Sequence, residues 1–229
     1  MVEKQANILS IPETVEDYMN EDPILKDPNG LDELHFRTYN DIDISEYEKF
    51  IHNAVNRFHS SRAYSNYKAF LFSIGLNRSQ LLGNLTADMG DKLIEMHHNM
   101  LTIFDIAFII CEHTLRTKGS ITSFELVKLL KKEHRENHVM LVMLDVSTHQ
   151  RLEASKHLDD EDKRMFIHPK MCFGDWVTFL DRYYLGITQD IAKKIVRFLD
   201  RAIKTDDTYD ANLVELRDNI ADWSEKYAR

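Results

Sequence analysis

The stretch that decides the fold reads KLIEMHHNMLTIFDI and covers residues 92–106. It begins with a short apolar run that is typical of a β-strand. The adjacent residues His97 and His98 follow at the end of this run. Thr102 and Asp105 then have the spacing of a capping box, in which two side chains satisfy backbone N–H groups at the start of a helix. The stretch therefore predicts a strand, a histidine pair and a helix, in that order.

A second strand-like run lies just before this stretch, at residues 80–86. The segment between the two runs contains Gly90 and has the composition of a turn. Two short strand-like runs joined by such a turn are typical of a hairpin. The sequence therefore predicts a hairpin over residues 80–96.

A third apolar run follows at residues 139–144, VMLVML. Its length is typical of a buried strand, although a helix remains possible for so short a run. Ser147 and Gln150 have the spacing of a helix start. The segment predicts a strand that leads directly into a short helix carrying His149.

The rest of the chain has mainly helical periodicity. Gly and Pro together number 11 of 229 residues, too few for the many tight turns of an all-β fold. The fold class is therefore α+β and mostly helical, with a short antiparallel hairpin embedded among helices. The further helices are predicted at residues 45–60, 61–74, 103–116, 122–135, 173–184, 190–203 and 212–227.

The chain has a net charge of −9, with acidic ends and a mildly basic middle. Residues 1–48 hold 13 acids and 3 bases, whereas residues 49–199 hold 17 acids and 21 bases. We expect residues 1–44, which also contain three prolines, to be a loosely packed extension. This acidic arm could bind a basic protein partner or shield a basic site; solvated surface charge is the alternative. A compact domain is expected over residues 45–186, followed by C-terminal helices at 187–229.

Several classes of protein are excluded at this point. The longest apolar runs have six residues, whereas a membrane-spanning helix needs about 20. The first residues show no signal-peptide pattern. Two cysteines, Cys111 and Cys172, are too few for a disulfide framework. We therefore expect a cytoplasmic protein with no membrane partner.

Histidines are concentrated in the middle of the chain, where eight of the 11 lie between residues 97 and 168. Neighbouring residues on a strand point to opposite sides, so one of His97 and His98 can bind a metal ion while the other faces water or substrate. His149 and Glu153 lie four residues apart on one face of the predicted helix. These residues are candidate metal ligands; the alternatives are core or surface histidines and a solvated carboxylate.

Three blocks resemble the HNH (His-Asn-His) endonucleases, and most closely their phage-encoded branch. The blocks are HHNMLTIFDI at 97–106, VMLVMLDVSTH at 139–149 and FGDWVTFL at 173–180. The resemblance covers about residues 58–185. It implies a ββα-metal core, in which two strands and a helix hold one divalent ion, within the domain at 45–186. It also implies a phage protein acting in the cytoplasm of the host cell.

The resemblance further implies metal-dependent hydrolysis of phosphodiester bonds in DNA. His98 would be the general base, and His97 and His149 would hold the divalent ion. Glu153 stands where relatives that bind metal strongly can have another histidine. A carboxylate at that position suits Mg²⁺ or Mn²⁺ better than Zn²⁺.

Two departures from the family pattern leave an alternative open. Met140 stands where the family has its middle asparagine, and Asn137, three residues earlier, is the candidate for that role. The cysteines that bind structural zinc in many relatives are absent. The alternative is a catalytically inactive phage protein, derived from an HNH core, that binds nucleic acid or a protein partner. An unrelated helical structural protein is a third reading.

Contacts to DNA are expected from one basic helix face, because lysine and arginine neutralise phosphate charge. The residues of this face are Lys128, Lys131, Lys132 and Arg135. Three nearby histidines are expected on helix surfaces: His113, His134 and His138.

Overall fold

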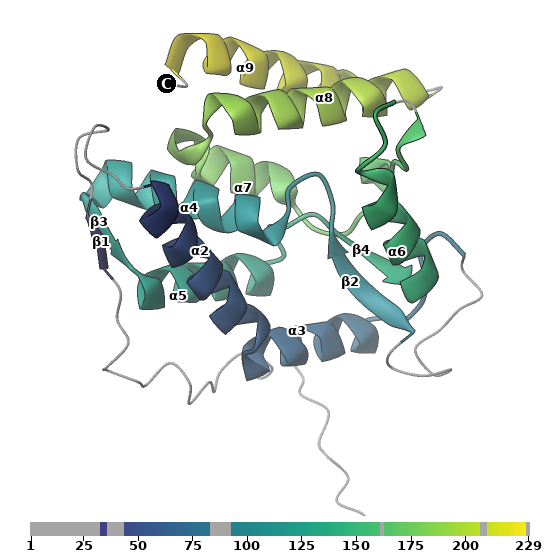
Figure 1. The fold of residues 1–229 in the computed structure, drawn as a ribbon. Helices are drawn as coiled ribbons and strands as arrows, with labels where there is room; N and C mark the ends of the chain where they lie inside the picture. Colours follow the sequence, from purple (N-terminus) through teal and green to yellow (C-terminus); the bar gives the residue numbers. More distant parts are fainter. Residues whose placement is uncertain (1–32, 36–43, 83–92, 161–162, 207–209, 228–229) are drawn as a thin grey trace, which may run out of the picture.

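The computed structural model describes residues 33–35, 44–82, 93–160, 163–206 and 210–227 (Figure 1). The helices are α2 (Ile44–His59), α3 (Arg62–Ser73), α4 (Ile103–Lys118), α5 (Ser123–Arg135), α6 (Val146–Ser155), α7 (Trp176–Arg182), α8 (Gln189–Thr205) and α9 (Ala211–Tyr227), with 3-10 turns η5 (Pro169–Met171) and η6 (Tyr184–Gly186). The strands are β1 (Glu33–His35), β2 (Ile94–His98), β3 (Ser120–Thr122) and β4 (Leu141–Asp145). The prediction of a mostly helical α+β fold is confirmed.

The first two long helices follow the predicted pattern. The apolar face of α2 is buried, including Ile51 and Phe58. The expected break after α2 occurs at Ser61, whose hydroxyl accepts a hydrogen bond from the backbone N–H of Tyr64 and so begins α3.

Helix α4 lies at the centre of the main core. It begins with the predicted capping box, formed by the side chains of Thr102 and Asp105, and ends at Gly119, which has a φ of +83°. Turn η6 packs directly against α4, and a Cβ atom on Gly186 would lie 1.9 Å from the carbonyl oxygen of Ile109. Glycine is therefore required where η6 approaches α4.

Strands β2 and β4 form an antiparallel pair, with Ile94 opposite Asp145 and His98 opposite Leu141. This arrangement corrects the prediction of a hairpin over residues 80–96. Residues 80–82 form a turn, and residues 83–92 lie outside the described part of the chain. The described partner of β2 comes from more than 40 residues further along the chain.

The other edge of β4 explains why this pairing replaces the hairpin. Gln80 exchanges hydrogen bonds with Met143 there, and Phe173 forms a β-bridge with Leu141. Strand β4 therefore separates Gln80 from β2. All five residues of β4 are buried, so its apolar side chains gain more burial in this central position than at an edge.

The two faces of the β2–β4 pair contact different parts of the molecule. Ile94, Met96 and Met143 belong to the main core. Val142 and Leu144 point to the other face and pack with Leu152 of α6 in a smaller cluster. Figure 1 shows α6 beside this strand pair.

Helix α6 begins directly after β4, as predicted, but its first residue differs from the prediction. Asp145, not Ser147, caps the helix and accepts a hydrogen bond from the backbone N–H of Thr148. Hydrogen bonds from Ser147, Thr148 and Ser79 hold the pKa of the Asp145 carboxyl well below its ordinary value, despite opposing desolvation. This firm cap fixes His149 in the first turn of α6.

The two ends of the chain are described to different extents. Within the predicted acidic extension, the structure describes β1, which pairs antiparallel with β3; the expectation of loose packing otherwise concerns residues outside the described part. At the other end, α8 and α9 pack side by side along the top of the molecule in Figure 1. Among the described residues, no helix combines the length and hydrophobicity needed to cross a membrane.

Candidate metal site and basic cleft

The alternation of β2 decides which of its side chains can act together. Glu95 and His97 point to the face of the sheet covered by α6, whereas Met96 and His98 point to the main core. His97 lies opposite Val142 in the strand pair, and Val142 packs toward α6. A residue on the inner face of α6 can therefore contact His97.

The three predicted metal ligands meet at this place. One nitrogen each from His97 and His149 and one oxygen of Glu153 lie within 4.8 Å of one another. Oε1 of Glu153 lies 3.7 Å from Nδ1 of His97 and 3.7 Å from Nε2 of His149. The structure thus brings together residues that the sequence separates by more than 50 positions, in an arrangement that could hold one divalent ion.

A fourth residue, Glu95, supports this cluster and was not predicted. Its carboxylate lies 2.5 Å from Nδ1 of His149, so the imidazole donates that proton and keeps its lone pair on Nε2, toward Glu153. Histidines that bind metals commonly donate their second N–H to a carboxylate in this way. The signal in the sequence was the two-residue spacing from Glu95 to His97, which places both on one face of a strand.

The protonation states of the cluster suit a cation. Burial lowers the pKa of His97 to about 4, so its imidazole is neutral near pH 7 and offers a lone pair. Hydrogen bonding and charge from Lys156 hold the pKa of Glu153 below its ordinary value, although desolvation opposes this. The ammonium of Lys156 lies 2.6 Å from Oε1 of Glu153, where it would compete with a metal ion for that oxygen.

His98 lies in a different environment from His97. Its Nε2 is 2.8 Å from Nε2 of His134, and Nδ1 of His134 is 2.7 Å from the carbonyl oxygen of Leu130. A carbonyl only accepts, so His134 donates through Nδ1 and accepts from His98 through Nε2. His98 must then carry its proton on Nε2 and its lone pair on Nδ1.

This pair corrects one prediction about the histidines. His134 was expected on a helix surface, but its side chain is fully buried, with the ring of Phe58 4.6 Å away between centroids. Burial lowers the pKa of His134 to about 4 and that of His98 well below its ordinary value. Both rings are therefore neutral at pH 7. His134 is wholly inside the core, whereas His98 also lines the cleft next to His97.

Asn137 occupies the turn between α5 and β4. Its φ is +56°, a left-handed conformation that asparagine tolerates better than most residues. Its side-chain oxygen accepts a hydrogen bond from the hydroxyl of Tyr67, and its carbonyl accepts one from the backbone N–H of Asp175. These contacts hold the loop in front of β4. Met140, at the position of the family asparagine, is buried.

A second group of possible ligands consists of Glu133, Glu136 and His138. The guanidinium of Arg182 already lies between the two carboxylates, 2.8 Å from Glu133 and 3.0 Å from Glu136. The hydroxyl of Tyr183 also donates a hydrogen bond to Glu133. The positive charge of Arg182 neutralises part of the negative charge of the two carboxylates. This second group therefore fits a metal ion less well than the first cluster does.

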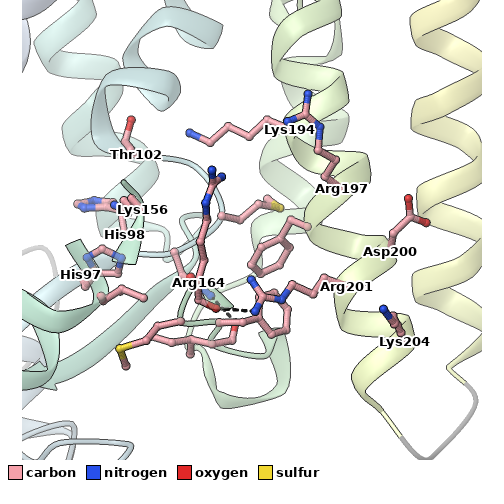
Figure 2. Close-up of a pocket in the computed structure, with 17 residues that line it drawn as sticks. His97, His98, Thr102, Lys156, Arg164, Lys194, Arg197, Asp200, Arg201 and Lys204 are labelled. Atoms are coloured by element: carbon pink, nitrogen blue, oxygen red, sulfur yellow. Dashed lines mark hydrogen bonds between the residues drawn. The ribbon is translucent and has the colours of Figure 1, made fainter. Parts of the chain in front are cut away.

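A cleft of about 540 Å³ opens beside the first cluster, and His97 lines its wall. One wall comes from α8, and the other comes from the end of β2, α6 and the segment around Arg164. In Figure 2, Lys194, Arg197 and Arg201 lie on the α8 wall, with His97 and His98 across from them. The side chain of Arg164 stands between the two walls.

The charged side chains that line this cleft are mainly basic, which the sequence did not predict. A single acid, Asp200, belongs to the lining. The basic residues of the lining are Lys156, Arg164, Lys194, Arg197, Arg201 and Lys204. Four of them lie on one helix at helical spacing, which is the signal by which they could have been found.

The four basic residues predicted to contact DNA lie elsewhere, on α5. Lys128 is exposed, and Lys132 and Arg135 are partly exposed. In the described part of the chain, no residue of α5 lines the cleft. The structure thus does not bring Lys128, Lys131, Lys132 and Arg135 together with the candidate metal ligands.

Comparison with known proteins relates the chain to a phage protein family. A family model described as a bacteriophage G278-like virion protein matches residues 1–225 of the chain. The curated proteins contain no match, and neither do the solved structures. The expectation of a phage protein is confirmed, whereas the resemblance to HNH endonucleases stays a prediction.

Proposed function

The chain belongs to the family of bacteriophage G278-like virion proteins, and from this premise we propose that it binds a divalent metal ion and hydrolyses phosphodiester bonds in DNA. The convergence of His97, His149 and Glu153 within 4.8 Å carries the proposal. The chain order of strand, strand and helix around these residues is the order that a ββα-metal core requires. Helix α4, the short strand β3 and helix α5 form the connection between the two strands.

The donor set narrows the choice of metal. Imidazole nitrogen suits Zn²⁺ and related transition metals, whereas carboxylate oxygen suits Mg²⁺ and Mn²⁺. Mg²⁺ prefers oxygen ligands and loses water reluctantly. Two imidazoles and one carboxylate therefore favour Mn²⁺ over Mg²⁺, and Zn²⁺ is the next candidate, because its catalytic sites include His₂Glu sets.

In this proposal, a divalent ion supplies positive charge next to the phosphate that is attacked. The side chains supply position and proton transfer. Glu95 fixes the ring of His149, and burial keeps His97 neutral. The lone pair on Nδ1 of His98 would accept the proton of the attacking water, because Nε2 of that ring donates to His134.

A second candidate function is binding without cleavage, and it corresponds to the inactive HNH-derived protein considered above. The observation that favours it is the contact between His98 and His134, which commits one ring nitrogen of the expected base to the core. The buried Met140 in place of the family asparagine points the same way. Metal binding and nucleic-acid binding are common to both candidates.

Metal binding is the first test. Purified protein treated with EDTA is titrated with Mn²⁺ and Zn²⁺ by calorimetry, and with Co²⁺ by visible absorption. We expect one site per chain. The His149→Ala variant should lose at least about 100-fold in affinity, because an inner ligand should matter at least as much as the outer partners of metal ligands. His157→Ala, an exposed histidine just after α6, is the matched control and should bind as the wild type does.

Cleavage is the second test. Wild-type protein and the His149→Ala variant are incubated with supercoiled plasmid and with single-stranded DNA, with each metal or with EDTA. Nicking by the wild type alone, and only with metal, would support hydrolysis. Metal binding without cleavage would leave the second candidate in place. Equal metal affinity in the wild type and His149→Ala would overturn the proposed site.

A further inference from the structure

We propose that the basic cleft between α8 and the segment around Arg164 holds the sugar–phosphate backbone of a single-stranded nucleic acid. This inference rests on the proposed function in one respect, which is that the ligand is a nucleic acid. The cleft, its charge and its shape are independent of whether the metal cluster cleaves anything.

The charge of the lining selects a polyanion. Six basic side chains and one acid line the cleft, in a chain whose net charge is −9. Of the six, Lys156 is ion-paired with Glu153 and Lys194 with Asp105, but the basic side chains still outnumber the carboxylates in and beside the cleft. The acid, Asp200, is compensated from α9 by Arg217, whose Nη1 lies 2.6 Å from its carboxylate. A concave wall with one sign of charge concentrates counter-ions of the opposite sign.

The basic residues of α8 form a row, which suits a chain of phosphates better than a single anion. Lys194, Arg197, Arg201 and Lys204 follow one another at intervals of three or four residues, so they share one face of the helix. With a rise of 1.5 Å per residue, the row is about 15 Å long. Figure 2 shows these side chains along the same wall of the cleft.

The size and the apolar part of the lining favour an unpaired strand. A volume of about 540 Å³ is in the range of pockets that hold compact ligands, and a duplex would have to stay outside it. Phe166 and Phe198 belong to the lining, with ring centroids 5.2 Å apart. The guanidinium of Arg201 lies 4.9 Å above the ring of Phe166. Basic and aromatic side chains side by side are typical of surfaces that bind single strands.

The cleft is continuous with the metal cluster. His97 is a member of the cluster and also lines the cleft. Lys156 lines the cleft and bonds Glu153 of the cluster. A strand that follows the α8 row would therefore pass beside the candidate metal ligands.

The test measures binding of a fluorescein-labelled dT oligonucleotide by anisotropy, in EDTA so that metal chemistry is absent. The variant is Arg197→Glu with Lys204→Glu, two exposed positions on the α8 row. We expect at least about tenfold weaker binding. The slope of log K against log salt should fall by about 1.4, since each phosphate contact on a single strand contributes about 0.7.

The matched control is Lys193→Glu, which changes an exposed lysine on the same helix that does not line the cleft. It should bind dT as the wild type does. Unchanged binding by the double variant, or an equal loss in the control, would overturn the inference. Binding of a duplex as tightly as dT would overturn the choice of a single strand. If dT binding is weakened by Lys128→Glu on α5 but not by the double variant on α8, the assignment of the binding site to the cleft would also be overturned.

The two proposals fail in distinguishable ways. If dT binding depends on the α8 row but the wild type never cleaves DNA, the inference stands and hydrolysis falls. If metal-dependent cleavage is seen and the double variant binds and cleaves dT as the wild type does, hydrolysis stands and the inference falls.

Discussion

The two sides of strand β2 carry the same residue type with opposite consequences. His97 faces α6, meets His149 and Glu153, and lies at the edge of a basic cleft. His98, the next residue, points to the other face of the strand and pairs with the buried ring of His134, although it also lines the cleft. The comparison teaches that strand alternation, more than residue identity, decides which histidine can serve as a ligand and which stabilises the fold.

The largest effect expected from this comparison concerns stability. The His98→Ala variant removes the donor to Nε2 of His134, which leaves a buried acceptor unpaired and a cavity beside it. We expect a loss of about 3 kcal/mol in the free energy of unfolding, measured by urea denaturation. His97 is buried to the same extent as His98, but its ring nitrogen lies 3.7 Å from a carboxylate that is itself half-exposed. His97→Ala therefore leaves no buried hydrogen-bond acceptor unpaired and should cost less than His98→Ala.

A double variant separates folding from chemistry at this position. His98→Leu with His134→Leu replaces both partners by apolar groups, which is often nearly neutral, so its stability at pH 7 should lie within about 1 kcal/mol of the wild type. If the wild type cleaves DNA and this stable variant does not, His98 acts in catalysis. A double variant as unstable as His98→Ala would contradict the view of the pair as one hydrogen-bonded unit.

The second prediction concerns the pH dependence of stability. An unfolded histidine takes up a proton below about pH 6.5, but His134 in the fold does so only near its pKa of about 4. The unfolded state therefore binds more protons as the pH falls from 6.5 to 4, and stability is lost in that window. From pH 7 to pH 5 we expect His134 to contribute a loss of about 2 kcal/mol.

The double leucine variant provides the control for this pH dependence. Between pH 7 and pH 5, the free energy of unfolding should fall less in this variant than in the wild type. The difference should be at least the loss of about 2 kcal/mol expected from His134. Parallel curves for the two proteins would show that the buried pair is not what couples stability to pH.

The third prediction sharpens the other side of the strand. Glu95→Gln keeps the shape of the side chain but removes the charge that orients His149. Outer partners of metal ligands typically contribute about 10-fold to 100-fold in affinity, and we expect a loss of Mn²⁺ affinity in that range. Calorimetry measures it, and Glu48→Gln, at an exposed position on α2, is a control expected to show no change.

The smallest expected effect concerns the competition for Glu153. Lys156→Met removes the ammonium that bonds its Oε1. Exposed ion pairs contribute up to about 1 kcal/mol, so Mn²⁺ affinity should rise by up to about fivefold. The same variant should weaken dT binding slightly, because Lys156 also lines the basic cleft. A fall in Mn²⁺ affinity would show instead that Lys156 supports the cluster.

Local signals predicted much of the helical architecture. Thr102 begins a helix through the predicted capping box. The helices predicted to begin at residues 61 and 122 are capped by Ser61 and Thr122. The pair His149 and Glu153 also came from a local rule, because residues four apart on a helix share a face. Their meeting with His97 depended on the resemblance to the HNH family, since nothing local relates β2 to α6.

Non-local contacts were the source of the errors. The run at 80–86 has a composition suitable for a strand, but β4 pairs with β2 because its five buried residues require neighbours on both edges. The position of His134 next to His98 depends on how α5 packs against the sheet. The basic cleft combines residues from β2, α6 and α8, so no single segment of sequence showed it.

The sequence by itself determined where most helices begin and end, the alternation of β2 and the helical face shared by His149 and Glu153. These features depend on interactions within a few residues of one another, and such interactions exist before the chain folds. Only the tertiary structure decided the partner of β2, the burial of His98 against His134 and the place where the positive charge gathers. Those outcomes depend on which distant surfaces exclude water together, and that choice is made by the whole chain.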